Sequence, residues 1–218
     1  MKKKLLIVFI FVHTICVPQI KVELPRIVAP LRIDKVIKTP IYTSYFSYSA
    51  HNPLFVTYVL FHGGGDCSRQ AMTFSTQNQF NSATSNDYDL EYDKGHMANA
   101  EDFAYDCEKE KITFRYYNAL PQTPKLNRGI WKQFETKFRE ESQKDSLFII
   151  CGGYDFSIVK NSMRVPRQCF KIVKNIRTKT IRSYIFPNDN SDTYKQVSLD
   201  VLLGSLGYDS GNIKLSLK

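Results

Sequence analysis

Several features that mark common protein classes are missing from this sequence. The longest apolar run, from Leu5 to Val12, is too short to cross a membrane comfortably. The chain has no internal repeat and no low-complexity block, and its 23% charged and 43% hydrophobic residues describe an ordinary globular protein, not a disordered one. It has five cysteines but no Cys-x-x-Cys pair, so a zinc site of the usual spacing is not expected.

The sequence also lacks the nucleophile motif of the α/β-hydrolases. His62-Gly63-Gly64-Gly65 is similar to the oxyanion loop of lipases and esterases, but no Gly-x-Ser-x-Gly string accompanies it. The nearest string, residues 207–211, has the wrong spacing. The interpretation we prefer is a flexible glycine turn that follows a strand.

The first 18 residues have the pattern of a targeting segment. Three lysines precede the apolar run, which continues patchily to Val17, as in a secretory signal. No clear cleavage pattern follows, so an uncleaved membrane anchor formed by residues 5–17 stays open as an alternative. We therefore expect a leader at 1–18, one domain at 19–218, and a secreted, periplasmic or extracellular protein with no stable membrane partner.

Charge and cysteine content fit an exported protein that meets polyanions. The net charge is +9, and about +6 remains when the three N-terminal lysines are set aside. This excess favours nucleic acid or anionic membrane surfaces as partners. Beyond the leader, an even number of cysteines predicts two disulfides, in a pairing that sequence does not choose, while free thiols remain the alternative; the four are Cys67, Cys107, Cys151 and Cys169.

Apolar patterning predicts an α+β fold with a mainly antiparallel sheet flanked by helices. A helix is expected over 127–144, where Trp131, Phe134 and Phe138 recur at spacings of three and four and Asn127 is a suitable N-cap. Ser198 is expected to cap a short closing helix. Residues 63–92 are expected to form a long loop, and the predicted strands are 54–62, 112–120, 146–153 and a hairpin of 169–175 with 180–188.

One group of residues supplies what phosphodiester hydrolysis needs. Water must be activated by a base with a pKa near neutral, and developing negative charge must be neutralised, which a hard cation with oxygen ligands can do. His96 is the candidate base, Lys94 a cation, and Asn118, Asn127 and Glu135 are oxygen donors. Each residue alone has an ordinary explanation, such as a turn, a helix cap or an i, i+4 ion pair.

Helix geometry suggests how two of these residues share a cation. On one continuous helix Asn127 and Glu135 are separated by about 12 Å of rise, too far for both to be direct ligands. Helical side chains lean towards the N-terminus, so Glu135 points back towards Asn127. We therefore expect Asn127 to bind the metal directly and Glu135 to act through water.

Taken together, the motifs resemble those of the sugar-non-specific DNA/RNA endonucleases of the ββα-metal (His-Me finger) class, which include endonuclease G. That family carries Asp-Arg-Gly-His, then Ser-Asn-x-x-Pro-Gln, then Leu-Asn-x-Gly-x-Trp-x-x-x-Glu. Here the pieces read DKGHMANAEDF at 93–103 and YNALPQTPKLNRGIWKQFE at 117–135. The resemblance is specific in this segment and extends more weakly from about residue 43 to residue 208.

The resemblance implies roles for individual residues. His96 would be the general base, Asn127 the direct ligand of one Mg²⁺, with Mn²⁺ able to substitute, and Glu135 would orient the waters of the metal. Asn118 would position His96 or the phosphate region. Arg69 lies where the family often has a phosphate-binding arginine, although that alignment crosses a variable loop.

One departure from the family pattern concerns the cation of the first motif. Lys94 stands where the family usually has an arginine, and its ammonium offers a point charge instead of the bidentate fork of a guanidinium. We expect a metal-dependent endonuclease that acts on DNA and RNA through phosphate contacts, with little sequence preference and with activity reduced by this lysine. The alternative is a catalytically silent nucleic-acid-binding or uptake protein on the same fold, and a homodimer stays open.

Overall fold

A computed structural model describes residues 31–76 and 81–218 of the chain. The predicted leader at 1–18 therefore lies outside the described residues. Within them, no helix has the length and apolar character needed to cross a bilayer.

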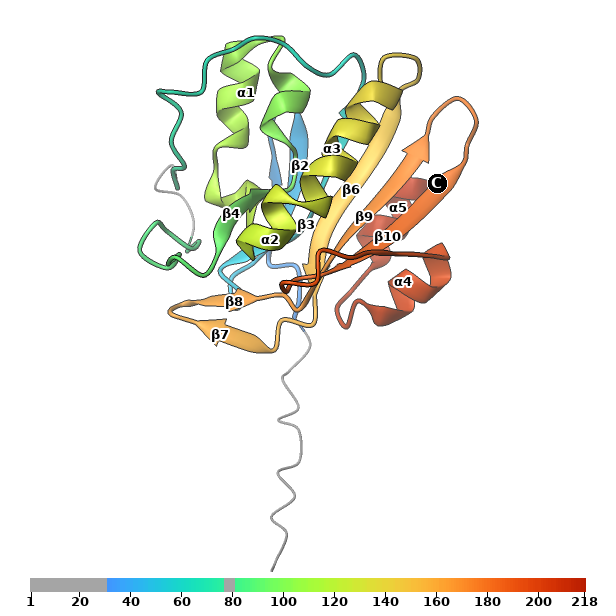
Figure 1. Ribbon diagram of the computed structural model, residues 1–218. Coiled ribbons are helices and arrows are strands. Elements are labelled where there is room, and N and C mark those ends of the chain that lie inside the picture. Colours follow the sequence, from blue (N-terminus) through green and yellow to red (C-terminus); the bar gives the residue numbers. More distant parts are fainter. Residues whose placement is uncertain (1–30, 77–80) are drawn as a thin grey trace, which may run out of the picture.

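The centre of the protein is a seven-stranded sheet in which every neighbouring pair is antiparallel (Figure 1). This confirms the predicted α+β fold with a mainly antiparallel sheet. In spatial order the strands are β1 (Lys35–Lys38), β2 (Tyr42–Ser47), β3 (Asn52–Leu60), β6 (Leu147–Tyr154), β9 (Gln168–Asn175), β10 (Ile181–Pro187) and β11 (Lys195–Val197).

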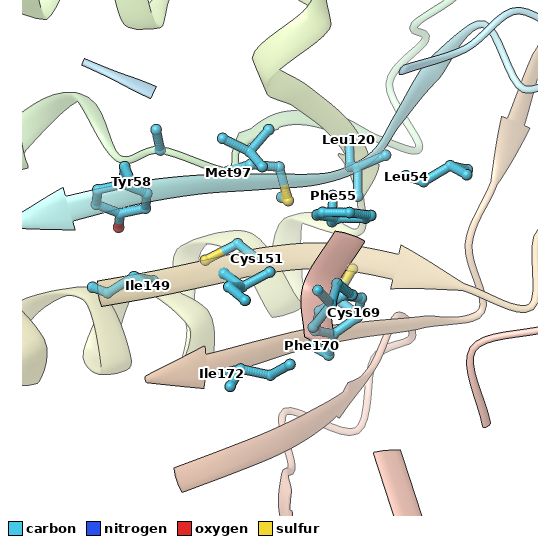
Figure 2. Close-up of a cluster of buried hydrophobic side chains, with 14 of the residues drawn as sticks. Leu54, Phe55, Tyr58, Met97, Leu120, Ile149, Cys151, Cys169, Phe170 and Ile172 are labelled. Carbon is cyan, nitrogen blue, oxygen red and sulfur yellow. The ribbon is translucent and has the colours of Figure 1, made fainter. Parts of the chain in front are cut away.

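The three central strands, β3, β6 and β9, are buried on both faces because layers of chain cover both sides of the sheet. β4 (Asp93–His96), α1 (Cys107–Thr113), α2 (Pro124–Arg128) and α3 (Ile130–Glu141) lie on one face, and α5 (Gly211–Leu217) lies on the opposite face (Figure 1). α4 (Leu199–Ser205) packs beside β10. The core between them includes Leu54, Phe55, Ile149 and Phe170, all within 1% of complete burial (Figure 2).

Most of the predicted elements are present at the expected places. β3 and β6 correspond to the two predicted buried strands, and β9 and β10 form the predicted hairpin. The side chain of Ser198 accepts a hydrogen bond from the Val201 amide and caps α4. A small hairpin of β7 (Ile158–Lys160) and β8 (Met163–Val165), and the short strands β1 and β2, were not predicted.

The predicted strand at 112–120 is wrong. Asp106 caps α1, which continues to Thr113, and a 3₁₀ turn, η2 (Tyr116–Asn118), follows. Apart from an isolated bridge of Arg115 with Ser75, the strand there is β5 (Ala119–Gln122), which pairs with β4 outside the main sheet. The aromatic residues there, Phe114, Tyr116 and Tyr117, are buried against the rest of the domain, and tertiary packing overrides their strand propensity.

The helix predicted at 127–144 is broken, and Asn127 is not its N-cap. Thr123 caps α2 by accepting from the Leu126 amide, and Pro124 occupies the first turn, so Asn127 lies inside α2. Gly129 separates α2 from α3. A Cβ at Gly129 would lie 2.2 Å from Oδ1 of Asp192, which accepts a hydrogen bond from the Ile130 amide and caps α3 from a distant loop.

The cysteines form one disulfide instead of the two predicted. Cys67 and Cys107 are bonded, whereas Cys151 and Cys169 are free and fully buried in the core (Figure 2). Cys151 lies opposite Lys171 and Cys169 opposite Gly153 in the β6–β9 ladder, so the two thiols occupy different pairs of the register. They behave as small core residues, which is common for buried cysteine.

Candidate active site

The candidate site is built on a short antiparallel ribbon followed by two helices. β4 pairs with β5 so that His96 lies opposite Ala119 and Gly95 opposite Leu120. Gly95 is required by a close approach: a Cβ there would lie 1.9 Å from Oε1 of the fully buried Gln122. With α2 and α3 after it, this ribbon forms the predicted ββα motif.

Two apolar side chains fix the ribbon to the sheet. Met97 follows His96 directly, Leu120 belongs to β5, and both are fully buried in the core cluster that contains Leu54 and Cys151 (Figure 2). Burying one such side chain contributes roughly 1.5–3 kcal/mol. The core therefore sets the position of His96, one residue away from this anchor.

A cleft of about 390 Å³ is lined by β4, α2 and α3 of this motif, by residues 99–101 that follow β4, and by Arg69 of the preceding loop. It brings together four of the six predicted site residues, His96, Asn127, Glu135 and Arg69, but neither Lys94 nor Asn118. The lining residues are Arg69, His96, Asn99, Ala100, Glu101, Asn127, Arg128, Lys132, Glu135, Thr136 and Arg139.

His96 lies in an aromatic setting, with one ring nitrogen buried and unpaired. Its ring lies 4.8 Å, between centroids, from both Phe74 and Phe114, and Nε2 has no hydrogen-bond partner within the described residues. Burial, aided by the positive charge of Arg69, lowers the pKa of His96 to about 3. The imidazole is therefore neutral at pH 7, and one of its two nitrogens carries a lone pair that can accept a proton.

Asn127 is oriented by the first residue of the motif. Asp93 accepts a hydrogen bond of 3.0 Å from Nδ2 of Asn127 and binds Arg128 through two further bonds of 2.8 and 2.7 Å. Because the amide nitrogen is engaged, Oδ1 is the atom left to bind a ligand in the cleft. No hydrogen bond to Oδ1 occurs within residues 31–76 and 81–218, the part of the chain that the structure describes.

Glu135 lies at the inner wall of the cleft and is 9% exposed. Nζ of the buried Lys171 lies 3.9 Å from Oε1 of Glu135 and 3.6 Å from the centroid of the Trp131 ring. Burial raises the pKa of Glu135 to about 7, although the nearby Lys171 charge opposes this shift. The carboxylate is thus poised to gain or lose its charge near neutral pH.

Asn118 and Lys94 are close in sequence or space to His96 but lie outside the cleft. Asn118 is completely buried; its Oδ1 accepts from the Ala98 amide, and its Nδ2 donates to the carbonyls of Ala98 and Thr113. These bonds hold the segment that follows His96. The ammonium of Lys94 lies 5.4 Å from the centroid of the Tyr88 ring.

Arg69 reaches the cleft from the long loop after β3. It forms ion pairs with Glu101 and with the buried Glu110 of α1. The Cys67–Cys107 disulfide joins the same loop to the first residue of α1. A covalent bond and two ion pairs thus hold the guanidinium at the cleft.

Sequence reasoning missed several residues of the site. Arg139 entered only as the partner in the ordinary i, i+4 ion-pair explanation of Glu135, yet its Nε donates to Asp102 at 3.1 Å and its side chain lines the cleft. The spacing of Lys132, Glu135 and Arg139 along one helix face could have indicated both cations. No sequence signal indicates Lys171, which lies in a distant strand.

Comparison with known proteins decides the family. The model of the DNA/RNA non-specific endonuclease family matches residues 23–210, most of the chain. The chain belongs to this family. The matched range includes every predicted site residue. The family match confirms the resemblance drawn from the motifs.

Similar proteins include a nuclease and mitochondrial endonuclease G. A nuclease from Nostoc sp. (strain PCC 7120 / SAG 25.82 / UTEX 2576) is 34% identical over 58% of this chain and 55% of its own length. Mitochondrial endonuclease G from Bos taurus and from Homo sapiens is 27% and 26% identical, over 57% of this chain and 49% of theirs. The matched region thus spans about half the length of these curated relatives.

A solved structure supports the fold. A chain in the crystal structure of the EndoG/EndoGI complex superimposes with a TM-score of 0.69 at 21% identity, covering 79% of this chain and 83% of that chain. At this identity the likeness establishes the architecture, and the site chemistry has to be argued from the side chains described above.

Proposed function

We propose that the protein is a metal-dependent endonuclease that hydrolyses phosphodiester bonds of DNA and RNA with little sequence preference. The observation that carries this proposal is the cleft, in which the neutral His96 lies with Asn127 and Glu135 among cationic side chains. A base, oxygen donors for a cation and positive charge for phosphate are the groups that this reaction needs.

His96 is proposed to take the proton from the attacking water. It is neutral at pH 7, so it can accept a proton without first losing one. The charge of Arg69 is one cause of its lowered pKa, and an anionic phosphodiester beside Arg69 opposes that charge. Substrate binding is therefore expected to raise the basicity of His96 when it is needed.

The donor set of the cleft fits a hard divalent cation. Asn127 offers an amide oxygen whose partner nitrogen is fixed by Asp93, and Glu135 offers a carboxylate on the same cleft. Mg²⁺ prefers such oxygen donors and retains several waters, and Mn²⁺ accepts similar ligands. Asn127 would hold Mg²⁺ directly and Glu135 through water; when bound, the cation supplies neutralisation of charge on the phosphate.

Asn118 is proposed to act as a positioning residue. Its three side-chain hydrogen bonds join Ala98 to Thr113, and its carbonyl accepts from the Met97 amide at 2.9 Å. The residues on the C-terminal side of His96 are therefore held to the turn before β5. Replacing Asn118 should displace His96 without removing any atom that touches substrate.

Contacts to phosphate explain activity on both DNA and RNA. Cationic side chains that line the cleft bind the backbone, which both polymers share, whereas sequence is read through base edges. Binding should therefore weaken steeply with salt. The disulfide is consistent with an oxidising compartment, so we propose an extracellular or periplasmic location.

A direct experiment tests the proposal against the catalytically silent alternative. Plasmid DNA and RNA are incubated with residues 19–218, in Mg²⁺ and in EDTA, beside His96→Ala. We expect cleavage of both polymers in Mg²⁺, none in EDTA, and a loss of roughly 100-fold or more in His96→Ala. His62→Ala, an exposed histidine outside the cleft, is the control and should cleave normally. Binding without cleavage by the unmodified protein would support the silent alternative.

A further inference from the structure

The four cations that line the cleft differ in how far they are already neutralised. Arg128 is paired with Asp93 and Arg139 with Asp102. Arg69 is shared between two carboxylates. Each of these guanidinium groups already uses part of its charge and some of its N–H donors on a carboxylate, so only the rest can bind a phosphate.

Lys132 is the exception among these four. Its side chain is exposed, and it makes no ion pair or hydrogen bond to any residue of 31–76 or 81–218. No carboxylate of these residues therefore holds its ammonium group. Such a group can bind a phosphate without first breaking a contact within the protein.

The position of Lys132 on α3 relates it to the proposed reaction centre. Lys132, Glu135, Thr136 and Arg139 all line the cleft, which is the i, i+3, i+4, i+7 stripe of one helix face. Lys132 lies one turn before Glu135, a rise of about 4.5 Å along the axis. Backbone phosphates follow one another along a strand at a short, regular spacing, so a cation one turn from Glu135 on the same helix face can meet a phosphate that neighbours one bound beside Glu135.

We propose that Lys132 binds the backbone phosphate next to the scissile one, towards the N-terminal end of α3. This inference rests on the proposed nuclease function for the identity of the ligand, a polynucleotide strand. Lys132 is thus a substrate-binding residue and takes no part in proton transfer.

Binding is measured first, without turnover. A fluorescently labelled single-stranded oligonucleotide is titrated in EDTA, over a range of salt concentrations, with wild type, Lys132→Gln and Lys137→Gln. Lys137 is a matched control because it is exposed on the same helix, outside the cleft, with its ammonium 5.3 Å from the Phe134 ring centroid. Both variants lose one charge, so the overall field of the protein changes equally.

Lys132→Gln should bind roughly 3- to 10-fold more weakly than wild type, and its salt slope should fall by about 0.7, as expected for the loss of one phosphate contact to a single strand. Lys137→Gln should stay within about twofold of wild type with an unchanged slope. Equal effects of the two substitutions would overturn the inference, because a general charge effect would then explain both.

Steady-state cleavage in Mg²⁺ provides the second readout. Lys132→Gln should raise KM with little change in kcat, because a contact to a flanking phosphate is already formed in the ground state. A fall in kcat at unchanged KM would contradict the assignment and place Lys132 at the scissile phosphate. Absence of cleavage by wild type would refute the proposed function, while the binding comparison would still decide the role of Lys132.

Discussion

Nζ of Lys171 lies 3.9 Å from Oε1 of Glu135, with the lysine side chain 1% exposed and the glutamate side chain 10% exposed. Lys171 comes from β9 and Glu135 from α3, so this pair joins the sheet to the helix that lines the cleft. Two groups that prefer water are thus held in the core, and Lys171 also lies 3.5 Å from the Sγ of Cys151. Because burial disfavours the charged form of Glu135, the free energy of burying this side chain depends on pH.

The first prediction concerns stability without a metal. The pKa of Glu135 is raised from 4.5 to about 7 by burial, so the folded protein binds this proton more tightly than the unfolded chain. The stabilisation is complete below pH 4.5 and is lost as the pH rises through 7. In EDTA, this one group should remove up to about 3 kcal/mol from the free energy of unfolding between about pH 5 and about pH 8.

Urea unfolding of wild type and Glu135→Gln at both pH values measures this effect. The glutamine variant should lose less stability across the interval. His96 acts in the opposite direction, since its pKa is lowered from 6.5 to about 3 and it costs stability as the pH falls below 6.5. Both proteins contain His96, so the difference between them isolates Glu135, and parallel pH dependences would show the assignment to be wrong.

The site was more predictable from sequence than the elements that carry it. The order and spacing of His96, Asn127 and Glu135 identified three residues that share a cleft, although the helix assumed to join the last two is broken at Gly129. Long apolar runs identified β3 and β6 because such strands are buried on both faces. Contacts made across the fold, such as Lys171 with Glu135, depend on strand register and leave no local pattern.

A second prediction concerns Lys94, the departure from the family motif. Lys94→Arg should raise the turnover rate, because a guanidinium offers two aligned donors to a phosphate and keeps its charge. Lys94→Gln is the companion variant and should lower turnover. The competing explanation is that Lys94 only packs over Tyr88, 5.4 Å from its ring centroid. In that case neither substitution would change turnover measured on plasmid DNA.

A third prediction concerns the disulfide that holds the Arg69 loop. Cys67 and Cys107 are 40 residues apart in sequence, and in the chain-entropy account a bond closing about 40 residues contributes about 4 kcal/mol to stability. The double variant Cys67→Ser with Cys107→Ser should therefore unfold at lower urea. It should also bind substrate more weakly, because Arg69 retains only its ion pairs with Glu101 and Glu110.

Reduction offers an independent check of the same bond. Cys107 is exposed, so dithiothreitol should reach the disulfide and reduce it to two thiols while the reagent is oxidised to its cyclic disulfide. Treated wild type should acquire the raised KM of the double variant. Dithiothreitol should leave the double variant itself unaffected, and a loss of activity there would trace the effect to another part of the protein.

The last prediction concerns Gly95, the third letter of the first motif. A Cβ at this position would lie 1.9 Å from Oε1 and 2.5 Å from Cδ of Gln122. A glutamine on the surface would swing away, but Gln122 is completely buried in β5 and is surrounded by packed chain. Gly95→Ala should therefore push β4 from β5, cost about 1–3 kcal/mol of stability, and displace His96 at the end of β4.

A compensating substitution separates this clash from any intrinsic demand for glycine. Gly95→Ala combined with Gln122→Ala removes the atoms that the new methyl group meets. Because the φ of Gly95 is not in the left-handed region, alanine can adopt this backbone conformation without strain. The double variant should recover more cleavage activity than Gly95→Ala alone, measured with Gln122→Ala as the reference. If activity stays as low as in the single variant, a clash with Gln122 does not explain why glycine is needed at position 95.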